Sequence, residues 1–519
     1  MSRSPSRRRS SYPLDRWATG LMAVLAVVIG VLLLSGDHAL ARVRDFTWGN
    51  RQVGTEDRAF LLTFSRPMDT ASVEKNLKVS PPLPGKISWA GRRMAYTLEV
   101  PAPYGETFTV SLDQAQDLFA KQEQRQSSFV AFQSTFSTRN RGFAYIGTEG
   151  EEAGRLVLAD LTRQDQQILT SKDLVVLAFK PYPLGDRILF AATDAAAYRE
   201  GQLDQKLYTV TTGLNPHPPE ALGTSARLAL LQLFQRPPQR QPAGQLKLVL
   251  DSDGYQNLKF DLSPDGQTIV VQRVNRDNPA DFGPWLVREG EAPQLLKTEP
   301  GGDFLIAPDS QSLVMLQGQG TAIIPLDEAA ERLTEPLDFL PNYGRVFDLS
   351  RDGSAAAMVN FNQNDPEQRY TESLFLVTNQ GEETELMQVS GTVMDAQFDP
   401  TNRILYSLTS ELLPGEEYVE QPVLSAVSLK EKTVTDLLLL PTQQNITMSL
   451  APDGLALLLN FEGALSVDGE APPPEVEATS NSIWLLPLFT TAEARLQAQS
   501  TQNQPEPMPF KGVQAAWLP

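Results

Sequence analysis

LKFDLSPDG, residues 258–266, is followed directly by a short apolar run at residues 268–271. This order predicts a β-hairpin, because proline presets the first turn position, aspartate bonds the backbone two residues on, and glycine accepts a positive φ. Four other segments show the same order of apolar strand, polar turn and apolar run: residues 304–310 (FLIAPDS), 346–353 (VFDLSRDG), 394–402 (MDAQFDPTN) and 447–454 (TMSLAPDG).

The turns recur at a regular spacing. Pro264 and Pro308 are 44 residues apart, and the next intervals, to Arg351, Pro400 and Pro452, are 43, 49 and 52 residues. Repeats of this length, each with room for about four short strands, are typical of β-propeller blades. The sequence therefore predicts an all-β fold in which residues 142–519 form a β-propeller.

Two further segments have the character of a first blade strand: residues 174–181 (LVVLAFKP) and 513–519 (VQAAWLP), which brings the number to seven. No second strand follows residues 513–519, whereas residues 143–146 and 154–161 have no first strand before them. Pairing these segments would close the ring and remove its open edges. We therefore expect a seven-bladed propeller closed by the C-terminal strand. Six blades is the alternative, since the unit at 302–336 is short.

The turn that recurs after each inner strand resembles the WD40-like blades of TolB-like propellers. The resemblance covers about 375 residues and implies the fold. It implies no single function, since such propellers serve as scaffolds, binding proteins and enzyme gates. Proline-specific peptidases carry a related propeller together with a hydrolase domain that has a G-x-S-x-G motif, and this sequence has no such motif.

Residues 43–138 contain several short strands of their own. Residues 59–65 (AFLLTFS) place Phe60, Leu62 and Phe64 on one face, the alternation of a half-buried strand. Residues 94–100, 107–112 and 129–136 give further strands, with prolines and glycines between them. Several short strands within about 95 residues predict a β-sandwich.

This segment also resembles a known family. Residues 63–69 (TFSRPMD) match the TFS-x-PMD signature of S-layer-type bacterial Ig-like domains. Further matches follow in the same order: residues 72–74, 79–81, Trp89, 104–107 and 136–138. The resemblance implies a spacer or adhesion module in which Met68 and Asp69 fix a loop, and no catalytic residue carries over.

Residues 17–35 (WATGLMAVLAVVIGVLLLS) contain no charged side chain. As a helix, this run would span about 28 Å, close to the ~30 Å hydrocarbon core of a bilayer. The sequence therefore predicts a transmembrane signal-anchor helix at residues 17–36. The basic tail, residues 1–16, is then cytoplasmic by the positive-inside rule, and the main body is periplasmic or otherwise extracytoplasmic.

A cleaved signal peptide is the competing interpretation of this segment. Ala39, Leu40 and Ala41 form an A-x-A pattern at a plausible distance from the apolar run. The apolar region of a signal peptide usually runs for about 7–15 residues, which is shorter than this one and favours a retained anchor. Cleavage after Ala41 stays open at the level of sequence.

Composition excludes several classes of function. The formal net charge of the chain is −19. Residues 1–16 carry five arginines and one aspartate, a net charge of +4, so the rest of the chain has a net charge of −19 − 4 = −23. A body this acidic would repel a phosphate backbone, which argues against nucleic-acid binding. The chain has no cysteine and only two histidines, His38 and His217. Disulfides, thiolate catalysis and cysteine metal sites are therefore excluded, and a histidine-based triad is nearly so.

Several patterns could mark a site, and each has a simpler structural interpretation. Asp251, Asp253 and Gly254 begin a calcium-loop pattern that is not completed, so a blade-connecting turn is expected. The acids at 416, 417 and 420 surround Tyr418 and could contact a ligand or solvate a loop. The repeated aspartates of the hairpins are expected to bond their own turns: Asp265, Asp309, Asp352 and Asp453. Residues 236–242 and 469–477 are proline-rich insertions, and residues 226–235 suggest a short helix.

The sequence thus assigns no catalytic, cofactor-binding or metal-binding residue. The leading hypothesis is a non-enzymatic, membrane-anchored envelope protein, in which an Ig-like spacer presents a propeller to a protein or glycan partner. The alternative is a carboxylate-based glycan-active enzyme with its site in the propeller funnel. Two acids about 5–10 Å apart at one mouth of the channel would favour the enzyme.

Overall fold

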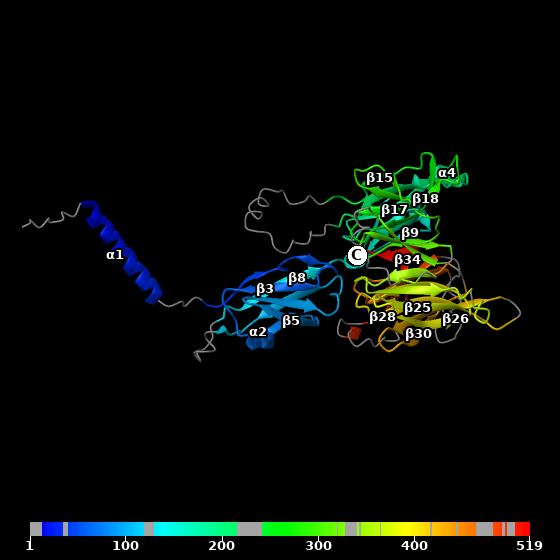
Figure 1. Cartoon of the computed structure of the whole chain (residues 1–519). Coiled ribbons are helices and arrows are strands. Elements are labelled where there is room, and N and C mark those ends of the chain that lie inside the picture. Colours follow the sequence, from blue (N-terminus) through cyan, green and yellow to red (C-terminus); the bar gives the residue numbers. More distant parts are fainter. Residues whose placement is uncertain are drawn as a thin grey trace, which may run out of the picture.

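The fold was analysed in a computed structural model of the chain (Figure 1). It describes residues 13–34, 40–118, 129–214, 241–318, 320–326, 340–341, 344–363, 365–415, 418–442, 445–462, 481–489, 494–495 and 504–519. The proline-rich insertions at 236–242 and 469–477 and the expected helix at 226–235 lie wholly or largely outside these residues. Within the described residues the chain consists of a helix, a β-sandwich and a ring of sheets, in that order.

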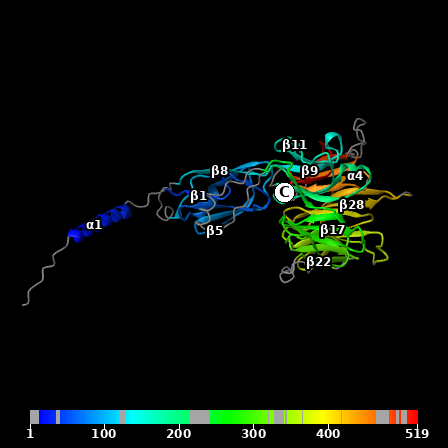
Figure 2. The same cartoon turned by 90° about the horizontal axis from the view of Figure 1, so that it is seen from above.

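Helix α1 spans Pro13–Leu34 and stands apart from the sandwich (Figures 1 and 2). Its apolar side chains are exposed, among them Leu21, Met22 and Val24. Within the described residues, no helix has both the length and the apolar character that a membrane crossing needs. The predicted anchor at 17–36 is only partly described, since residues 35–36 and several of its side chains lie outside the described part. The anchor stays a prediction.

Residues 43–138 form two packed antiparallel sheets, as the alternating strands predict. The first sheet has the order β1-β3-β6-β5, with strands Val43–Phe46, Ala59–Phe64, Arg93–Leu98 and Gly85–Ala90. The second has the order β2-β8-β7-β4, with strands Gln52–Val53, Phe132–Thr138, Thr107–Leu112 and Leu77–Ser80. In this second sheet only the short β2–β8 pair is parallel.

The core of the sandwich is aromatic. Phe60, Leu62 and Phe64 are fully buried, and the ring of Phe60 stacks on Tyr96 with centroids 5.0 Å apart. From the second sheet, Phe108 stacks on Phe136. One element that the sequence analysis does not predict is the short helix α2, Thr70–Asn76, which follows the TFSRPMD segment and buries Val73 in this core.

Seven antiparallel sheet units follow the sandwich. Strands β9 (Gly142–Gly147), β10 (Leu156–Asp160) and β11 (Asp165–Ile168) belong to the first unit. The second contains β12 (Leu174–Pro181), β13 (Arg187–Asp194), β14 (Lys206–Thr211) and β15 (Leu246–Leu250), and the third β16 (Tyr255–Leu262), β17 (Thr268–Asn275), β18 (Phe282–Arg288) and β19 (Gln294–Leu295). The fourth has three described strands, β20 (Phe304–Ile306), β21 (Ser312–Gln317) and β22 (Gly320–Pro325).

The remaining units repeat the meander. The fifth contains β23 (Arg345–Leu349), β24 (Ala355–Asn360), β25 (Glu372–Thr378) and β26 (Glu383–Val389), and the sixth β27 (Val393–Phe398), β28 (Ile404–Leu412), β29 (Glu420–Ser428) and β30 (Thr433–Leu439). The seventh starts with β31 (Thr447–Leu450), β32 (Ala456–Glu462) and β33 (Asn481–Pro487). The second strands are largely buried, which agrees with their mainly apolar sequences.

One strand closes the ring. β34, Glu506–Trp517, pairs through its first half with β33, the third strand of the seventh blade. Its second half pairs with β9, where Val513 faces Ile146 and Trp517 faces Phe143. The strand therefore serves as the fourth strand of the last blade and the first strand of the first blade. The described strands form seven blades, the number that the repeats predict, and the shared strand is longer than the 513–519 segment expected from sequence.

The closure generates a stability prediction at Trp517. This side chain is 6% exposed, packs edge-to-face on Phe143 and donates from Nε1 to the carbonyl oxygen of Ser449 at 3.1 Å. Because it joins the first blade to the seventh, Trp517→Ala should destabilise the propeller by about 3–5 kcal/mol, the usual cost of deleting a large buried ring. Chemical denaturation followed by tryptophan fluorescence and circular dichroism measures the effect.

The matched control for this experiment is Tyr370→Ala. Tyr370 is 84% exposed, so its loss should change the free energy of unfolding by less than about 0.5 kcal/mol. Equal unfolding midpoints for Trp517→Ala and the unchanged protein would contradict the role of β34 in closure.

Candidate functional site

The turns that join the first and second strands of the blades face the sandwich. Three contacts establish this orientation: Asp453 accepts the N–H of Tyr104 at 2.9 Å, Arg351 donates to the carbonyl of Thr55 at 3.3 Å, and Arg139 donates to the carbonyl of Pro183 at 3.3 Å. We call this side of the propeller the proximal face and the opposite side the distal face. Figures 1 and 2 show the sandwich on one side of the propeller and α4, Ala195–Arg199, on the other.

Asp453 is the centre of the domain junction. Its Oδ2 accepts both the Tyr104 N–H and, at 2.8 Å, a guanidinium N–H of Arg141. Its own carbonyl accepts from Arg495, which also reaches Asp399 of the neighbouring blade at 3.2 Å. Asp453, Asp399 and Arg495 are all at most 3% exposed. A carboxylate in the seventh blade therefore holds the sandwich by charge-assisted bonds that are shielded from water.

All four hairpin aspartates also do what the sequence analysis expects. Each accepts, through Oδ1, the backbone N–H two residues further on, at 2.8–3.1 Å: Gln267 for Asp265, Gln311 for Asp309, Ser354 for Asp352 and Leu455 for Asp453. The sequence identifies the turn role that all four share. It does not distinguish Asp453, because the second role depends on a contact with a residue 349 positions away.

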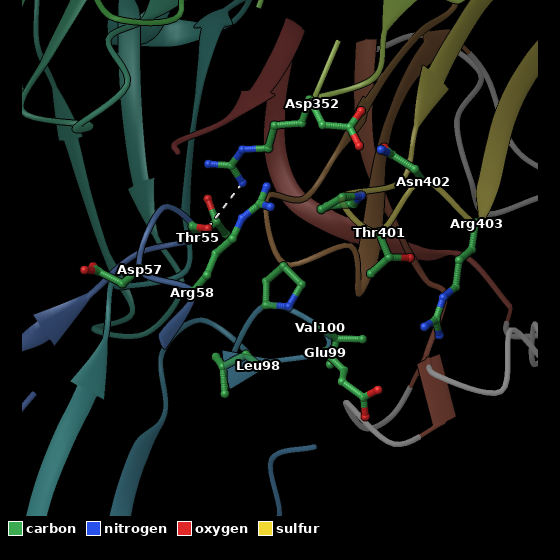
Figure 3. A pocket seen from close by; sticks show the side chains of 13 residues that line it. Thr55, Asp57, Arg58, Leu98, Glu99, Val100, Asp352, Thr401, Asn402 and Arg403 are labelled. Carbon is green, nitrogen blue, oxygen red and sulfur yellow. Dashed lines mark hydrogen bonds between the residues drawn. The ribbon is translucent and has the colours of Figure 1, made fainter. Parts of the chain in front are cut away.

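A cavity of about 200 Å³ lies at the junction between the sandwich and the fifth and sixth blades. Figure 3 looks into it: Arg58, Leu98 and Glu99 enter from the sandwich, and Asp352 and Thr401 from the propeller. Its acids already have partners, because Glu99 pairs with Lys86 and Asp57 accepts the N–H of Gly54. The pKa of Arg351 is lowered by burial and by the nearby charge of Arg58. Acids and arginines are balanced around this cavity, so we assign it to the junction.

A larger cavity, about 680 Å³, marks the proximal mouth of the central channel. Phe347, Asp348 and Asp395 line its wall, and Thr55 of the sandwich reaches its edge. The first strand of every blade borders the channel, so the N–H groups on its channel side have no strand partner and must be satisfied in another way.

Side chains at one aligned position satisfy these N–H groups. Four bonds of this kind run from the N–H of one blade to a side chain of the preceding blade: Ile306 to Asp261 Oδ2 (2.7 Å), Phe398 to Asp348 Oδ2 (2.8 Å), Leu450 to Gln397 Oε1 (3.0 Å) and Trp517 to Ser449 Oγ (3.2 Å). These bonds lie in a ring around the channel and join four of the seven pairs of neighbouring blades.

The other three positions of the ring follow from residue chemistry. Lys180 and Leu305 cannot accept a hydrogen bond. At these places the N–H groups of Leu262 and Leu349 donate instead to Oδ1 of the aspartate in their own strand, Asp261 and Asp348, at 2.8 and 2.9 Å. The seventh position is Pro181, which has no N–H to satisfy.

Charge in the channel is paired in part. Lys180 pairs with Asp261, and Lys259 and Arg345 both pair with Asp303. Burial lowers the pKa of Lys259 to about 8. Burial raises the pKa of Asp348 to about 7, and the charge of Asp395 adds to this rise. The pKa of Asp395 is also raised by burial. Among the described residues, no lysine or arginine forms an ion pair with Asp348 or Asp395.

The distal face carries the exposed apolar side chains of the blade hairpins. These hairpins join the second and third strands and so lie at the strand ends opposite the proximal turns. Six large side chains on them are at least 40% exposed: Tyr198, Leu203, Tyr370, Leu412, Leu413 and Tyr418. Tyr370 and Tyr418 project furthest, at 84% and 75% exposure.

The sequence candidates outside the hairpin aspartates are placed as follows. Tyr418 and the acid at 420 lie on the distal face beside a cavity of about 440 Å³, whereas positions 416 and 417 lie outside the described residues. Asp251 accepts the N–H of Asp253 at 3.3 Å, the geometry of a blade-connecting turn. Within the described part of the chain, no group of three or more carboxylates or histidines is close enough to hold a metal ion. The sequence analysis does not identify the hydrogen-bond acceptors around the channel, because the N–H group that each of them accepts belongs to the next repeat.

The junction leads to a prediction for Asp453. Asp453→Ala should free the Tyr104 amide and Arg141, and amide hydrogen exchange at Tyr104 and Gly105 should become at least about tenfold faster, since about 1.4 kcal/mol is tenfold in an equilibrium constant. Asp265→Ala is the matched control, because it removes the same turn bond in a hairpin whose aspartate has no bond to the sandwich. Equal protection of Tyr104 in both variants would refute the anchoring role.

The channel leads to a pH prediction. A carboxyl whose pKa rises from 3.8 to about 7 on folding stabilises the protein while protonated, fully below pH 4, and this stability is lost as pH rises toward 7. Between pH 4 and pH 7.5, the free energy of unfolding of the unchanged protein should therefore fall by about 1–2 kcal/mol relative to that of Asp348→Asn. This value includes a reduction for screening of the carboxylate by solvent in the channel. Denaturation curves of both proteins at four pH values test this, and parallel pH profiles would contradict it.

No family model and no curated protein matches the chain. Among solved structures, the chain is similar to TolB from Acinetobacter baumannii, with 10% identity, a TM-score of 0.38, and coverage of 86% of this chain and 83% of that chain. It is also similar to an oligogalacturonate lyase from Vibrio parahaemolyticus, with 11% identity, a TM-score of 0.39, and coverage of 62% and 86%. A third similar structure is prolyl oligopeptidase B from Galerina marginata, with 9% identity, a TM-score of 0.42, and coverage of 85% and 52%.

The assignment of the fold rests on the six sheets of the ring, one of which contains both the first and the seventh blade joined through β34. The two-sheet sandwich is present, and its assignment to the S-layer-type Ig-like family stays a resemblance in sequence.

Proposed function

We propose that this chain is a non-enzymatic envelope protein that binds a protein partner on the distal face of its propeller. In this proposal the sandwich is a spacer, and the helix at 17–36 anchors the chain in a membrane. The observation that carries the proposal is the asymmetry of the propeller. Exposed tyrosines and leucines gather on the distal hairpins, whereas the proximal turns already bind the sandwich.

The distal side chains are of the kinds that protein interfaces use. Tyrosine contributes a large, rigid contact area at small entropic cost and is enriched in binding hot spots. Tyr198, Tyr370 and Tyr418 come from three different blades, so a partner could contact several hairpins at once. Leu203, Leu412 and Leu413 add apolar area, which favours a protein over a glycan as the partner.

Attachment to a membrane is proposed from the sequence, since no helix among the described residues has the length and apolar character of a membrane span. The uncharged run at 17–35 follows a basic tail, and the helix leaves Leu21, Met22, Val24 and Val27 exposed. A bilayer would cover these side chains. The N-terminus would then be cytoplasmic and the sandwich and propeller extracytoplasmic, with the distal face turned away from the membrane.

An enzymatic role is the second candidate, and one observation favours it. Asp348 and Asp395 lie at one mouth of the channel with raised pKa values, as glycan-active carboxylates often do. Their contacts favour a structural role instead. Both oxygens of Asp348 accept backbone N–H groups. The carboxylate of Asp395 accepts hydrogen bonds from the backbone N–H of Ala396 and from the side-chain amide of Gln397. Thr55 of the sandwich also borders this mouth.

The proposed function predicts the result of site-directed crosslinking in the native envelope. A photo-reactive amino acid at Tyr370, on the distal face, should give one discrete adduct with a protein in membranes from the source cells. The same probe at Gln267, an exposed proximal turn residue, should give no such adduct. Equal adducts at the two positions, or none at Tyr370 under conditions that crosslink known complexes, would refute the proposal.

A further inference from the structure

The cavity of about 440 Å³ on the sixth blade, which we call the Tyr418 pocket, has chemically distinct walls. Met394, Val419 and Pro422 supply apolar surface, Tyr418 supplies an aromatic ring that is 75% exposed, and Glu420 supplies a carboxylate. The pocket opens on the distal face, beside the exposed Leu412 and Leu413 of the same hairpin. The hydroxyl-bearing residues Thr392, Ser410 and Thr442 complete the lining. A cavity with both apolar and polar walls, one aromatic ring and one acid suits a long side chain with a cationic end.

The carboxylate of Glu420 is held in place and carries no counter-ion. Ser410 and Tyr418 both donate their hydroxyl groups to it. Among the described residues, no lysine or arginine forms an ion pair with it. The bond from Tyr418 places its hydroxyl group beside the carboxylate at the edge of the pocket. Neutral donors orient the acid and leave its negative charge uncompensated.

A second carboxylate, that of Glu372, lies next to the Tyr418 pocket. Glu372, in the neighbouring blade, accepts the N–H of Val393 at 2.7 Å, next to the pocket residues Thr392 and Met394. Burial raises the pKa of Glu372, and the charge of Glu420 adds to this rise. The two acids therefore repel each other, and the charge of Arg345, which lowers the pKa of Glu372, offsets part of that repulsion. A further cation beside Glu420 would relieve the rest.

We propose that the Tyr418 pocket binds a lysine or arginine side chain of the protein partner. This inference rests on the proposed function and names the partner's chemistry at one point of the distal face. The aliphatic stem would pack on Met394 and Pro422, and the charged end would meet Glu420 and the face of Tyr418. Such a combination of ion pair and cation–π contact is worth more in a partly desolvated pocket than on an open surface.

The charge of the whole distal face complements a basic partner. The described residues of five distal hairpins, 148–155, 194–205, 276–281, 361–371 and 411–420, contain twelve acids and four arginines. A field of this sign would attract a basic segment and speed its association. The ligand set does not suit calcium, which takes six to eight oxygen ligands, because the pocket has a single carboxylate and otherwise only the hydroxyl groups of Thr392, Ser410, Thr442 and Tyr418.

The test uses the full chain in detergent and two capped hexapeptides, one with three arginines and the other with three citrullines at the same positions. Citrulline keeps the shape of arginine and removes its charge. The arginine peptide should bind at least about tenfold more tightly in calorimetry, a difference of about 1.4 kcal/mol. Glu420→Gln and Tyr418→Ala should each weaken its binding by about fivefold or more.

Glu367→Gln is the matched control, because it removes one exposed acid from another distal hairpin and should leave binding within about twofold. Unchanged thermal unfolding midpoints verify that the three variants fold. Equal binding of both peptides, equal loss in Glu367→Gln and Glu420→Gln, or no binding of the arginine peptide would overturn the inference. Crosslinking from Tyr370 separates the two proposals. If the peptides give one of these results but the Tyr370 adduct still forms, the proposed partner on the distal face stands and only the basic side chain in the Tyr418 pocket is rejected.

Discussion

The propeller depends on hydrogen bonds to the backbone N–H groups that its inner strands turn toward the channel. A strand that borders a channel has one side without a neighbour, and N–H groups left there would cost about 1–3 kcal/mol each. Here side chains at one aligned position accept those N–H groups, mostly from the next blade, so that Asp261, Asp348, Gln397 and Ser449 link consecutive blades. The ring therefore acts as a second closure, inside the one made by β34. It also gives the buried acids that line the channel a structural role, and among the described residues they form no group that could hold a metal ion.

The sequence predicts the repeating part of this molecule well, because the signals are local. Strand, Ser-Pro-Asp-Gly turn and strand lie within about fifteen residues, so residues 258–271 predict most of β16, the turn and the first half of β17. The alternation of Phe60, Leu62 and Phe64 likewise predicts a strand with one buried face. What the sequence does not predict lies between repeats or between domains. Asp453 and Asp265 have the same local sequence signal, and only the fold brings Tyr104 to one of them.

The domain junction gives the propeller its polarity. A free propeller has two similar faces, and either mouth of its channel could receive a ligand. Here Asp453 and Arg351 bind the sandwich, so the proximal turns are committed to a contact within the chain. The acidic, tyrosine-bearing hairpins on the opposite side are left for other molecules. The pKa of Asp348 is raised because this side chain is buried in the channel wall. Its role there is structural, since both its oxygens accept backbone N–H groups.

The shared strand β34 has a consequence for how the chain acquires its shape. Each blade from the second to the sixth is a local meander and can form as soon as its own residues are available. The first blade cannot, because its inner strand contains Val513 and Trp517, more than 360 residues after β9. Until that strand arrives, β9 and β33 present unpaired edges that could join other chains. A chain exported in an extended state would therefore remain vulnerable to mispairing until its last blade is outside, and assembly would end with a single cooperative step.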